Sequence, residues 1–314
     1  MQKKSSPREA YGRVLAELGA SCPELVVLDA DLSPSTKTNE FAKCYPERFF
    51  DMGIAEQNMM GTAAGFALAG KIPCASTFAV FATGRAYDQV RNAIAYPGLN
   101  VKIIATHAGV SVGEDGASHQ TIEDISLMRT LPNMTVIVPA DAVETAQAVT
   151  AAVKMKGPVY IRLGRPAFPE ILDQDYQFKI GKAVPLRHGS DAVIFSAGIM
   201  VSRALEAASL LAAEGIEIAV VNVSTIKPLD EETIIQMARK TRAVVTAEEH
   251  SIYGGLGSAV AEVLCENYPV PLERVGVMDR FGESGTPEQL LEVCGLTAKN
   301  IVAAVGRVIE RSQT

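Results

Sequence analysis

Residues 134–163 read MTVIVPADAVETAQAVTAAVKMKGPVYIRL, and this stretch decides the fold class. It opens with an apolar, β-branched run at 134–139, continues as an alanine-rich segment at 142–156, and closes with a second apolar run at 159–163. Short continuous apolar runs are typical of strands that are buried on both faces, and a segment of this length between them is typical of a crossover helix. The stretch therefore predicts a complete βαβ unit with two parallel strands.

The same alternation extends in both directions along the chain. Towards the N-terminus it predicts strands at 25–29, 72–78 and 101–106, with helices at 54–69 and 85–95. Towards the C-terminus it predicts strands at 192–196, 217–223, 243–247 and 274–277, with helices at 200–214, 231–240, 257–266 and 297–309. Between the two series the periodicity stops, and prolines and polar residues predominate. We therefore expect two Rossmann-like three-layer α/β domains, at 1–170 and 191–314, joined by a linker at 171–190.

The composition argues against several classes of protein. Its 314 residues are enough for two α/β domains, and 48% of them are hydrophobic. No apolar run reaches the ~20 residues of a membrane helix, and the first residues lack the apolar core of a signal peptide. Five scattered cysteines indicate reduced thiols, and a net charge of -7 gives no electrostatic basis for nucleic-acid binding. We expect a cytoplasmic protein that binds neither membranes nor nucleic acid.

Two short motifs resemble sites of other enzyme classes. Gly109-Val-Ser111-Val-Gly113 spells the G-x-S-x-G of a nucleophile elbow, but the residues behind the serine have loop rather than helix character. Gly255-Leu-Gly257 contains two of the three glycines of a dinucleotide fingerprint and stands apart from the strand before it. We expect both motifs to be structural turns.

Glu56 is the first residue with a candidate chemical role. It opens a predicted helix whose residues 57–70 carry no charge, so this helix should be packed on most sides. Burial of a carboxyl group favours its protonated form, which can donate a hydrogen bond. A first-turn glutamate can instead lie exposed, stabilised by the helix dipole. The residues alone leave both interpretations of Glu56 open.

A second candidate is the segment 107–120, which begins where a predicted parallel strand ends. Open α/β sheets bind ligands at this edge. The segment contains His107, Asp115 and His119, together with three glycines that allow the backbone to approach a ligand. The spacing of the histidines and acids matches no standard pattern of metal ligands. We expect a polar pocket for a hydroxylated substrate, and no metal held by these residues.

Several motifs, taken in order, resemble those of transketolases. They are Asp29-Ala-Asp31-Leu-Ser-Pro-Ser35, Gly53-Ile-Ala-Glu56-Gln57, Thr77-Phe78-Ala-Val-Phe81, Ala105-Thr-His107, Gly113-Glu-Asp-Gly116 with His119-Gln120, and the stretches 131–133 and 139–141. The resemblance covers the pyrimidine-binding and C-terminal domains, and hence nearly the whole chain. It implies a thiamine diphosphate-dependent enzyme of the pentose phosphate pathway, which transfers a two-carbon ketol unit from a ketose phosphate to an aldose phosphate.

The resemblance assigns four residues to the cofactor. Glu56 matches the glutamate that hydrogen-bonds N1′ of the aminopyrimidine ring and promotes its imino form, while the cofactor supplies the carbanion chemistry. Phe78 and Phe81 match the aromatic residues that hold this ring, although core packing is the ordinary role of such a pair. Asp31 matches an aspartate near the cofactor.

The resemblance assigns the remaining candidates to the sugar substrate. His107 and Asp115 match residues that contact the hydroxyl groups of the donor sugar. By this resemblance we also expect His107 to be a catalytic residue. His119 matches a histidine that lines the substrate channel. Arg8, Ser35 and Arg165 match the binding site of the sugar's phosphate, an anion that suits arginine geometry.

The chain departs from the family pattern in two respects. Gly84 stands where many transketolases have an aromatic residue, and the following Arg85-Ala-Tyr87-Asp88-Gln89 resembles 1-deoxyxylulose-5-phosphate synthase instead. The chain also lacks the Gly-Asp-Gly and the later asparagine that hold Mg²⁺ and the diphosphate in this class of enzyme.

The missing motif implies a second chain. We expect a transketolase N-terminal subunit to hold Mg²⁺ and the diphosphate, in an α2β2 heterotetramer with this chain. One alternative is the same half of a related thiamine-diphosphate enzyme, either 1-deoxyxylulose-5-phosphate synthase-like or 2-oxoacid dehydrogenase beta-like. The other alternative is a non-catalytic regulatory subunit of the same fold.

Overall fold

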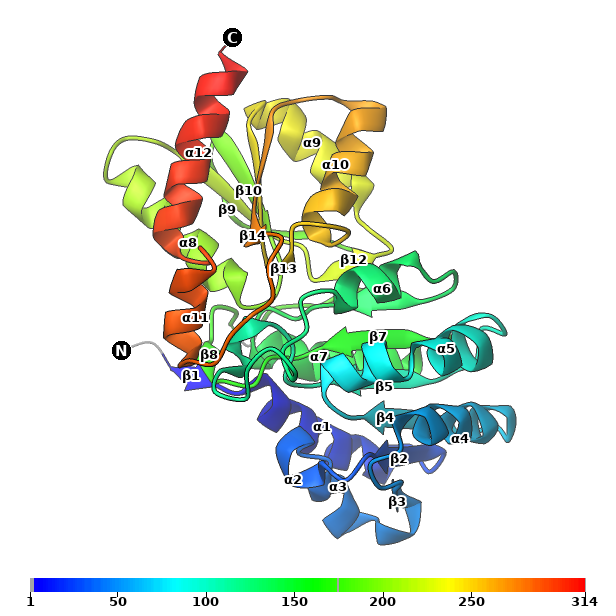
Figure 1. Ribbon diagram of the computed structural model, residues 1–314. Coiled ribbons are helices and arrows are strands. Elements are labelled where there is room, and N and C mark those ends of the chain that lie inside the picture. The colour runs from blue at the N-terminus through cyan, green and yellow to red at the C-terminus, as the bar shows by residue number, and fades with distance from the viewer. Residues whose placement is uncertain (1–2, 174, 314) are drawn as a thin grey trace.

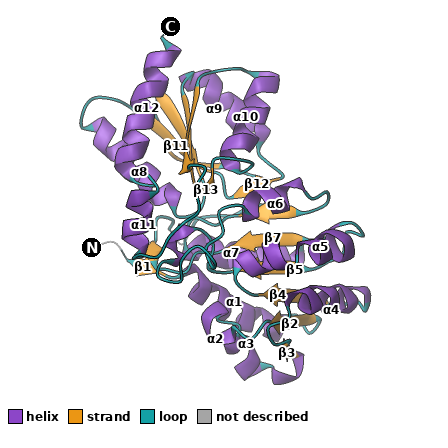
Figure 2. Ribbon diagram, viewed as in Figure 1, coloured by secondary structure: helices purple, strands orange, loops and turns teal. Residues whose placement is uncertain are grey.

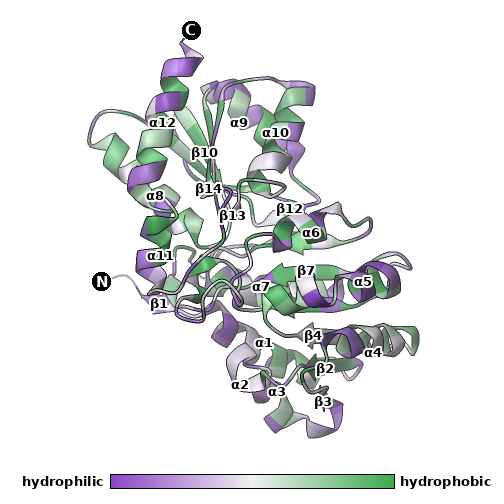
Figure 3. Cartoon of the chain, viewed as in Figure 1, coloured by the Kyte–Doolittle hydropathy of each residue, from purple (hydrophilic) through white to green (hydrophobic). Residues whose placement is uncertain are grey.

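The computed structural model describes residues 3–173 and 175–313 of the chain. They form two α/β units that lie one beside the other, each with a central sheet covered by helices (Figure 1). The β-branched and apolar runs of the sequence are the central strands, which Figure 3 shows in hydrophobic green. The fold class predicted from the sequence is confirmed.

The first sheet has seven strands in the order β12-β6-β7-β5-β4-β2-β3. Its strands are β2 (Leu25–Asp29), β3 (Phe49–Asp51), β4 (Ile72–Ser76), β5 (Lys102–Ala105), β6 (Thr135–Ile137), β7 (Val159–Arg162) and β12 (Thr225–Lys227). All pairs are parallel except β12 with β6, which is antiparallel. In Figure 2 the arrowheads of β4 and β7 accordingly point the same way.

Helices and helical turns connect these strands and cover both faces of the sheet. They are α1 (Pro7–Ser21), α2 (Ser33–Thr36), α3 (Asn39–Cys44), η1 (Pro46–Arg48), α4 (Glu56–Leu68), η2 (Phe81–Arg85), α5 (Tyr87–Gln89), η3 (Val90–Ala95), η4 (Val110–Val112), α6 (Asp124–Thr130) and α7 (Ala142–Lys154). The predicted helix at 85–95 is present, but η2 and η3 are wide π-helical turns on either side of α5. Such turns are rare and often occur at functional sites.

The second sheet has five strands in the order β14-β13-β10-β11-β9, all parallel except β9. Its strands are β9 (Val184–Arg187), β10 (Ala192–Ser196), β11 (Ile218–Asn222), β13 (Val244–Ser251) and β14 (Leu272–Val277). The helices of this unit are α8 (Met200–Ala212), α9 (Glu231–Thr241), α10 (Leu256–Asn267), α11 (Pro287–Val293) and α12 (Ala298–Ser312). A short antiparallel pair, β1 (Lys4–Ser5) with β8 (Phe168–Pro169), lies near the junction of the two units.

Two features of the predicted domain layout need correction. The stretch 171–190 is not wholly a linker, because it contains β9, which pairs antiparallel with β11 at the edge of the second sheet. An edge strand tolerates a proline, and Pro185 lies in β9, so the proline that suggested a linker is compatible with a strand. In addition, β12 belongs to the second half of the chain but pairs with β6 in the first sheet, so the predicted C-terminal domain contributes one strand to the sheet of the N-terminal domain.

Candidate active site

Four neighbouring parallel strands of the first sheet end at one edge, and a predicted site residue follows each of them. Asp31 follows β2, Phe78 follows β4, the 107–120 loop follows β5, and Arg165 follows β7. This is the edge where open α/β sheets bind ligands. Glu56, the first residue of α4, and Arg8, in α1, come from separate helices.

Glu56 is buried, with 2% of its surface exposed, so the alternative of a solvated first-turn glutamate is wrong. Its two carboxylate oxygens accept hydrogen bonds from Nη1 of Arg85, at 2.8 and 3.0 Å. The main-chain carbonyl oxygen of Arg85 in turn accepts a hydrogen bond from the Gln57 side chain at 3.2 Å. The buried acid is therefore paired with a guanidinium group from the η2 turn.

An aromatic cluster lies beside this ion pair. The rings of Phe78 and Phe81 are 6.0 Å apart and stacked, and Phe78 also stacks on the His107 ring at 3.7 Å. The ring of His119 meets Phe81 edge-on at 5.4 Å. The Arg85 guanidinium lies over the Phe81 ring, with its carbon 4.4 Å from the ring centre, and so links the cluster to Glu56. Phe78 is 93% buried, so it packs into the core and the site at once.

His107 is held in a fixed orientation at the end of β5. Its backbone adopts a left-handed conformation, with φ at 56°, and only 3% of the residue is exposed. Nδ1 of the ring lies 2.8 Å from the hydroxyl oxygen of Thr106. Burial lowers the pKa of His107 to about 3, and the positive charges of Arg8 and Arg165 act in the same direction. The imidazole is therefore neutral at physiological pH, with one ring nitrogen as donor and the other as acceptor.

The structure also brings Arg8, Ser35 and Arg165 together. Arg8 donates to the main-chain oxygen of Ser35 at 2.9 Å and to that of Arg165 at 3.1 Å. Burial lowers the pKa of Arg8, and the charge of Arg165 lowers it further. Both arginines line one open pocket, and two cations that repel each other across a pocket favour a bound anion.

Glu114 lines the same pocket, and its neighbour Asp115 approaches Arg165. Nη1 of Arg165 donates to Glu114 at 3.1 Å, lies 3.8 Å from Asp115, and also donates to the main-chain oxygen of Val112 at 2.5 Å. The side chains of both acids are exposed, so they are available to hydroxyl groups of a ligand. An anionic ligand on Arg165 would have to displace Glu114.

Asp31 stands somewhat apart from the cluster. Its backbone is left-handed, with φ at 61°, and its side chain is exposed at the end of β2. The main-chain N–H of Asp31 donates to the Asp51 carboxylate at 3.1 Å, and that carboxylate also accepts from Gly53. The structure thus fixes the backbone of Asp31, while its side chain stays exposed to solvent.

The two motifs of other enzyme classes are structural. Ser111 is fully buried in η4, so it is not an accessible nucleophile, and its main-chain N–H donates to Glu249 at 2.7 Å. The first turn of α10, at Gly257, is occupied by the carboxylate of Glu248, which accepts from the N–H groups of Leu256 and Gly257 at 2.8 Å each. A protein carboxylate thus takes the place that a dinucleotide's phosphate would need.

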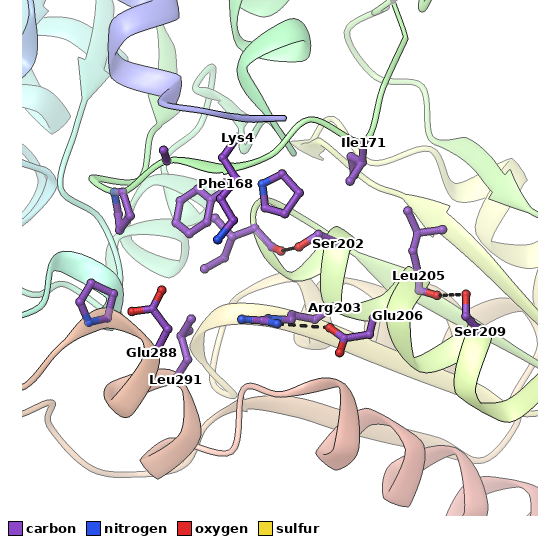
Figure 4. A pocket seen from close by; sticks show the side chains of 15 residues that line it. Lys4, Phe168, Ile171, Ser202, Arg203, Leu205, Glu206, Ser209, Glu288 and Leu291 are labelled. Atoms are coloured by element: carbon purple, nitrogen blue, oxygen red, sulfur yellow. Dashed lines mark hydrogen bonds and ion pairs between the residues drawn. The ribbon is translucent and has the colours of Figure 1, made fainter. Parts of the chain in front are cut away.

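A cavity of about 470 Å³ is lined by none of the predicted site residues (Figure 4). It is formed by α8, α11 and the strand β8, with Phe168 and Leu291 on its walls and the Arg203–Glu206 ion pair at one side. Its wall at Pro166 and Pro287 also borders the pocket of Arg8 and Arg165. Of the predicted site residues, Arg8 and Arg165 line that smaller pocket.

Among residues 3–173 and 175–313, no group of three or more His, Cys, Asp or Glu side chains is arranged to hold a metal ion. In the same part of the chain, no helix is both long and apolar enough to cross a membrane.

Sequence reasoning missed two sets of residues that shape the site. One is Arg85 as the partner of Glu56. A buried carboxylate requires a hydrogen-bond donor, but nothing in the sequence indicated which residue provides it. The other is a buried network of Asp124, Arg162 and Glu249 behind the 107–120 loop. Arg162 lies in a strand that was predicted to be buried, and a buried arginine requires carboxylate partners, so this signal was present in the sequence.

The fold and the site together define a two-domain α/β protein with acidic, aromatic and basic side chains forming a candidate ligand site at the carboxyl edge of its first sheet. Comparison with known proteins identifies the family. The model of the transketolase pyrimidine-binding domain matches residues 3–170, and that of the transketolase C-terminal domain matches residues 181–301. The chain belongs to the transketolase family.

Relatives of similar length support the resemblance to a split transketolase. A putative transketolase C-terminal section from Methanocaldococcus jannaschii is 50% identical over 95% of this chain and 94% of its own length. A 6-deoxy-6-sulfo-D-fructose transketolase subunit from Clostridium sp. is 47% identical over 97% of this chain and 94% of its own. A solved structure described as a split gene transketolase, inactive beta4 tetramer, matches with a TM-score of 0.92 and 59% identity, covering 98% of this chain and 99% of that one.

Proposed function

We propose that this chain is the C-terminal subunit of a two-chain, thiamine diphosphate-dependent transketolase. With an N-terminal subunit it would transfer a two-carbon ketol unit from a ketose phosphate to an aldose phosphate, a reaction of the pentose phosphate pathway. The observation that carries the proposal is the buried carboxylate of Glu56, which Arg85 links to the Phe81 ring, with His107 in the same aromatic cluster.

The residues present fit the pyrimidine half of thiamine diphosphate. Glu56 provides a buried carboxylate at a helix start, and the ring of Phe81 provides a flat apolar face. When bound, the cofactor supplies a nucleophilic carbon on its thiazolium ring. In that complex Glu56 would hold a proton at N1′ of the pyrimidine, and Phe78 and Phe81 would keep the ring in place. Arg85, which now contacts both Glu56 and Phe81, would have to share or release them.

The same geometry supports a role for the 107–120 loop in substrate binding. Nδ1 of the neutral His107 ring is engaged with Thr106, which leaves Nε2 for one hydrogen bond, and Asp115 accepts hydrogen bonds, so the two suit the hydroxyl groups of an extended sugar. Arg8 and Arg165 would bind the anionic group at the far end of that sugar. A sulfonate has the charge and oxygen acceptors of a phosphate, and one relative is named for a sulfonated ketose, so both anions should be tested.

Two observations support a partner subunit. The chain has no Gly-Asp-Gly motif with a later asparagine, so Mg²⁺ and the diphosphate would be held mainly by the other chain. The outer face of α4 is uncharged, with Leu68 and the preceding Ile54 each 76% exposed. Depletion of charged residues is a feature of the centre of protein interfaces, and α4 begins at Glu56, so a subunit docked there would meet the cofactor. We propose an α2β2 heterotetramer.

Co-purification with the N-terminal subunit and a ketol-transfer assay test the proposal. The complex should bind thiamine diphosphate and Mg²⁺ and transfer two carbons from a ketose phosphate or its sulfonate analogue. The isolated chain should bind the cofactor weakly and transfer nothing, because it lacks the diphosphate anchor. Robust transfer by the isolated chain would contradict the split-subunit proposal, and a complex without transfer would contradict the proposed activity.

A further inference from the structure

The 107–120 loop is held from behind by the second α/β unit. Glu249, on β13, is 3% exposed, and one of its carboxylate oxygens accepts the main-chain N–H of Ser111 at 2.7 Å. Ser111 lies midway between His107 and Asp115 in the sequence. A side chain of the second unit therefore bonds the backbone of the loop that carries two of the proposed substrate contacts.

The backbone of the loop is shaped to fit this carboxylate. Gly109 has a φ of +82°, and a Cβ at this position would lie 2.2 Å from the carboxyl carbon of Glu249. No side chain other than hydrogen is compatible with that approach. Gly109, which has no side chain, thus allows the backbone to pass directly over the Glu249 carboxylate.

Glu249 is itself fixed by a buried ion network. Arg162, on β7 of the first unit, donates to the main-chain oxygen of Glu249 at 2.7 Å, and its Nη1 lies 3.8 Å from the second carboxylate oxygen. Nε of Arg162 donates to Asp124 at 2.9 Å. Burial by itself lowers the pKa of Arg162, but the two acids outweigh it and raise the pKa. The network ties strand β13 to strand β7 and leaves Glu249 little freedom to move.

A second contact from the same unit supports the far end of the loop. The side chain of Gln120 bridges the main-chain oxygens of Gly113 and Glu283, at 3.1 and 2.9 Å. A Cβ at Gly116, where φ is +75°, would lie 2.6 Å from the hydroxyl oxygen of Ser284. The loop is thus enclosed between β13 and the stretch that precedes α11.

We propose that Glu249 is a positioning residue through which the C-terminal domain sets the place of His107 and Asp115 towards the donor sugar. The identity of the donor rests on the proposed function, but the positioning of the loop does not. This gives the C-terminal domain a part in substrate binding although it carries none of the residues that contact the substrate.

Variants of Glu249 and its neighbour Glu248 separate positioning from general stability. Glu249→Gln keeps an acceptor for the Ser111 N–H, whereas Glu249→Met keeps the bulk and removes the acceptor. Glu248→Met is the matched control, because Glu248 is equally buried on the same strand but bonds α10 instead. Gly109→Ala displaces the loop while it leaves every side-chain charge in place, so it replaces Glu249→Met if that variant fails to fold.

The first measurement is amide hydrogen exchange of the 107–116 segment in the isolated chain. Glu249→Met and Gly109→Ala should raise its exchange about tenfold or more, Glu249→Gln should restore most of the protection, and Glu248→Met should leave it unchanged. Unchanged exchange in both Glu249→Met and Gly109→Ala would overturn the proposal. This result stands whether or not the complex transfers ketol units.

The second measurement is steady-state kinetics of the reconstituted complex with a ketose phosphate. Loss of a hydrogen bond to a charged group should lower kcat/KM by about tenfold to a hundredfold in Glu249→Met, mainly through KM, with rescue in Glu249→Gln. An equal loss in Glu248→Met would show that Glu249 acts only through stability. An inactive wild-type complex would instead refute the proposed function and leave the exchange result to decide the positioning.

Discussion

Arg85 donates to both carboxylate oxygens of Glu56, and the same guanidinium lies over the ring of Phe81. These are the two groups that the proposed function reserves for the pyrimidine ring. In the chain by itself, therefore, a side chain of the η2 turn takes the acceptor and the ring face that a cofactor would use. This contact gives a physical reason to expect weak cofactor binding by the isolated subunit, in addition to the absent diphosphate anchor.

A double-mutant cycle in the isolated chain measures this pair. Arg85→Ala should lower the free energy of unfolding by roughly 1 kcal/mol, because it leaves a buried carboxylate without its donor. The value is modest because about half of the Arg85 side chain is exposed (48%). The neutral amide of Glu56→Gln is stabilised less by the guanidinium group than a carboxylate is. Arg85→Ala should therefore lower the free energy of unfolding by clearly less in the Glu56→Gln background.

Urea denaturation of the four proteins of the cycle gives the coupling. Arg91→Ala serves as the control, because the guanidinium of this arginine bonds the exposed Asn92 instead. Its effect should add to that of Glu56→Gln without coupling. Strict additivity of Arg85→Ala and Glu56→Gln would show that the ion pair contributes nothing in solution.

The proposed catalytic role of Glu56 has its own test in the proposed two-subunit complex. Glu56→Gln should retain the fold and bind thiamine diphosphate, but it should lose most of the exchange of the cofactor's C2 proton for deuterium. An amide cannot hold and return a proton at N1′ as a carboxylate does. An exchange rate close to that of the wild-type complex would remove Glu56 from the proton relay.

The burial of His107 predicts how the stability of the chain depends on pH. The pKa of His107 is lowered from 6.5 to about 3 in the folded chain. Between these values the unfolded chain binds the proton and the folded chain does not, so the stability is complete above pH 6.5 and declines as the pH falls towards 3. His107 alone should contribute a slope of up to about 1.4 kcal/mol per pH unit in this window.

His107→Asn should remove that contribution. The free energy of unfolding of the variant should therefore fall less steeply than that of the wild type between pH 6 and about pH 4. His188→Asn is the control, since His188 is exposed and its surroundings change little on folding. Parallel stability curves for wild type and His107→Asn would mean that His107 is protonated in the folded chain.

Much of the fold was predictable because it rests on local patterns. The strands at 25–29 and 192–196 were predicted to the residue, since each is a continuous apolar run that ends in a polar residue. The strands β9 and β12 were not, because each is short, lies at the edge of a sheet, and is specified by a partner distant in the sequence. The π-helical form of η2 likewise has no signal in hydrophobic periodicity.

The candidate site divides in the same way. The motifs indicated which residues gather at the sheet edge, and the structure places Arg8, Ser35 and Arg165 in contact although they lie far apart in the sequence. The partners of these residues were not predictable. Whether Arg85 turns towards Glu56, or Glu249 towards Ser111, depends on distances across the fold that a motif does not encode.

The proposed anion site at Arg8 and Arg165 gives the last prediction. Arg165→Ala should lower kcat/KM for a phosphorylated ketose donor by about tenfold to a hundredfold in the complex, because a charge-assisted contact to the phosphate is lost. Hydroxypyruvate has no phosphate, so its use should change little.

The competing explanation is structural, since Arg165 also donates to the main-chain oxygen of Val112 and could act by holding the 107–120 loop. In that case both donors would suffer alike. Arg187→Ala is the matched control, because Arg187 is buried to a similar degree but pairs with Glu217 in the second unit, so it should affect neither donor. Equal losses for the two donors in Arg165→Ala would show that the phosphate binds elsewhere.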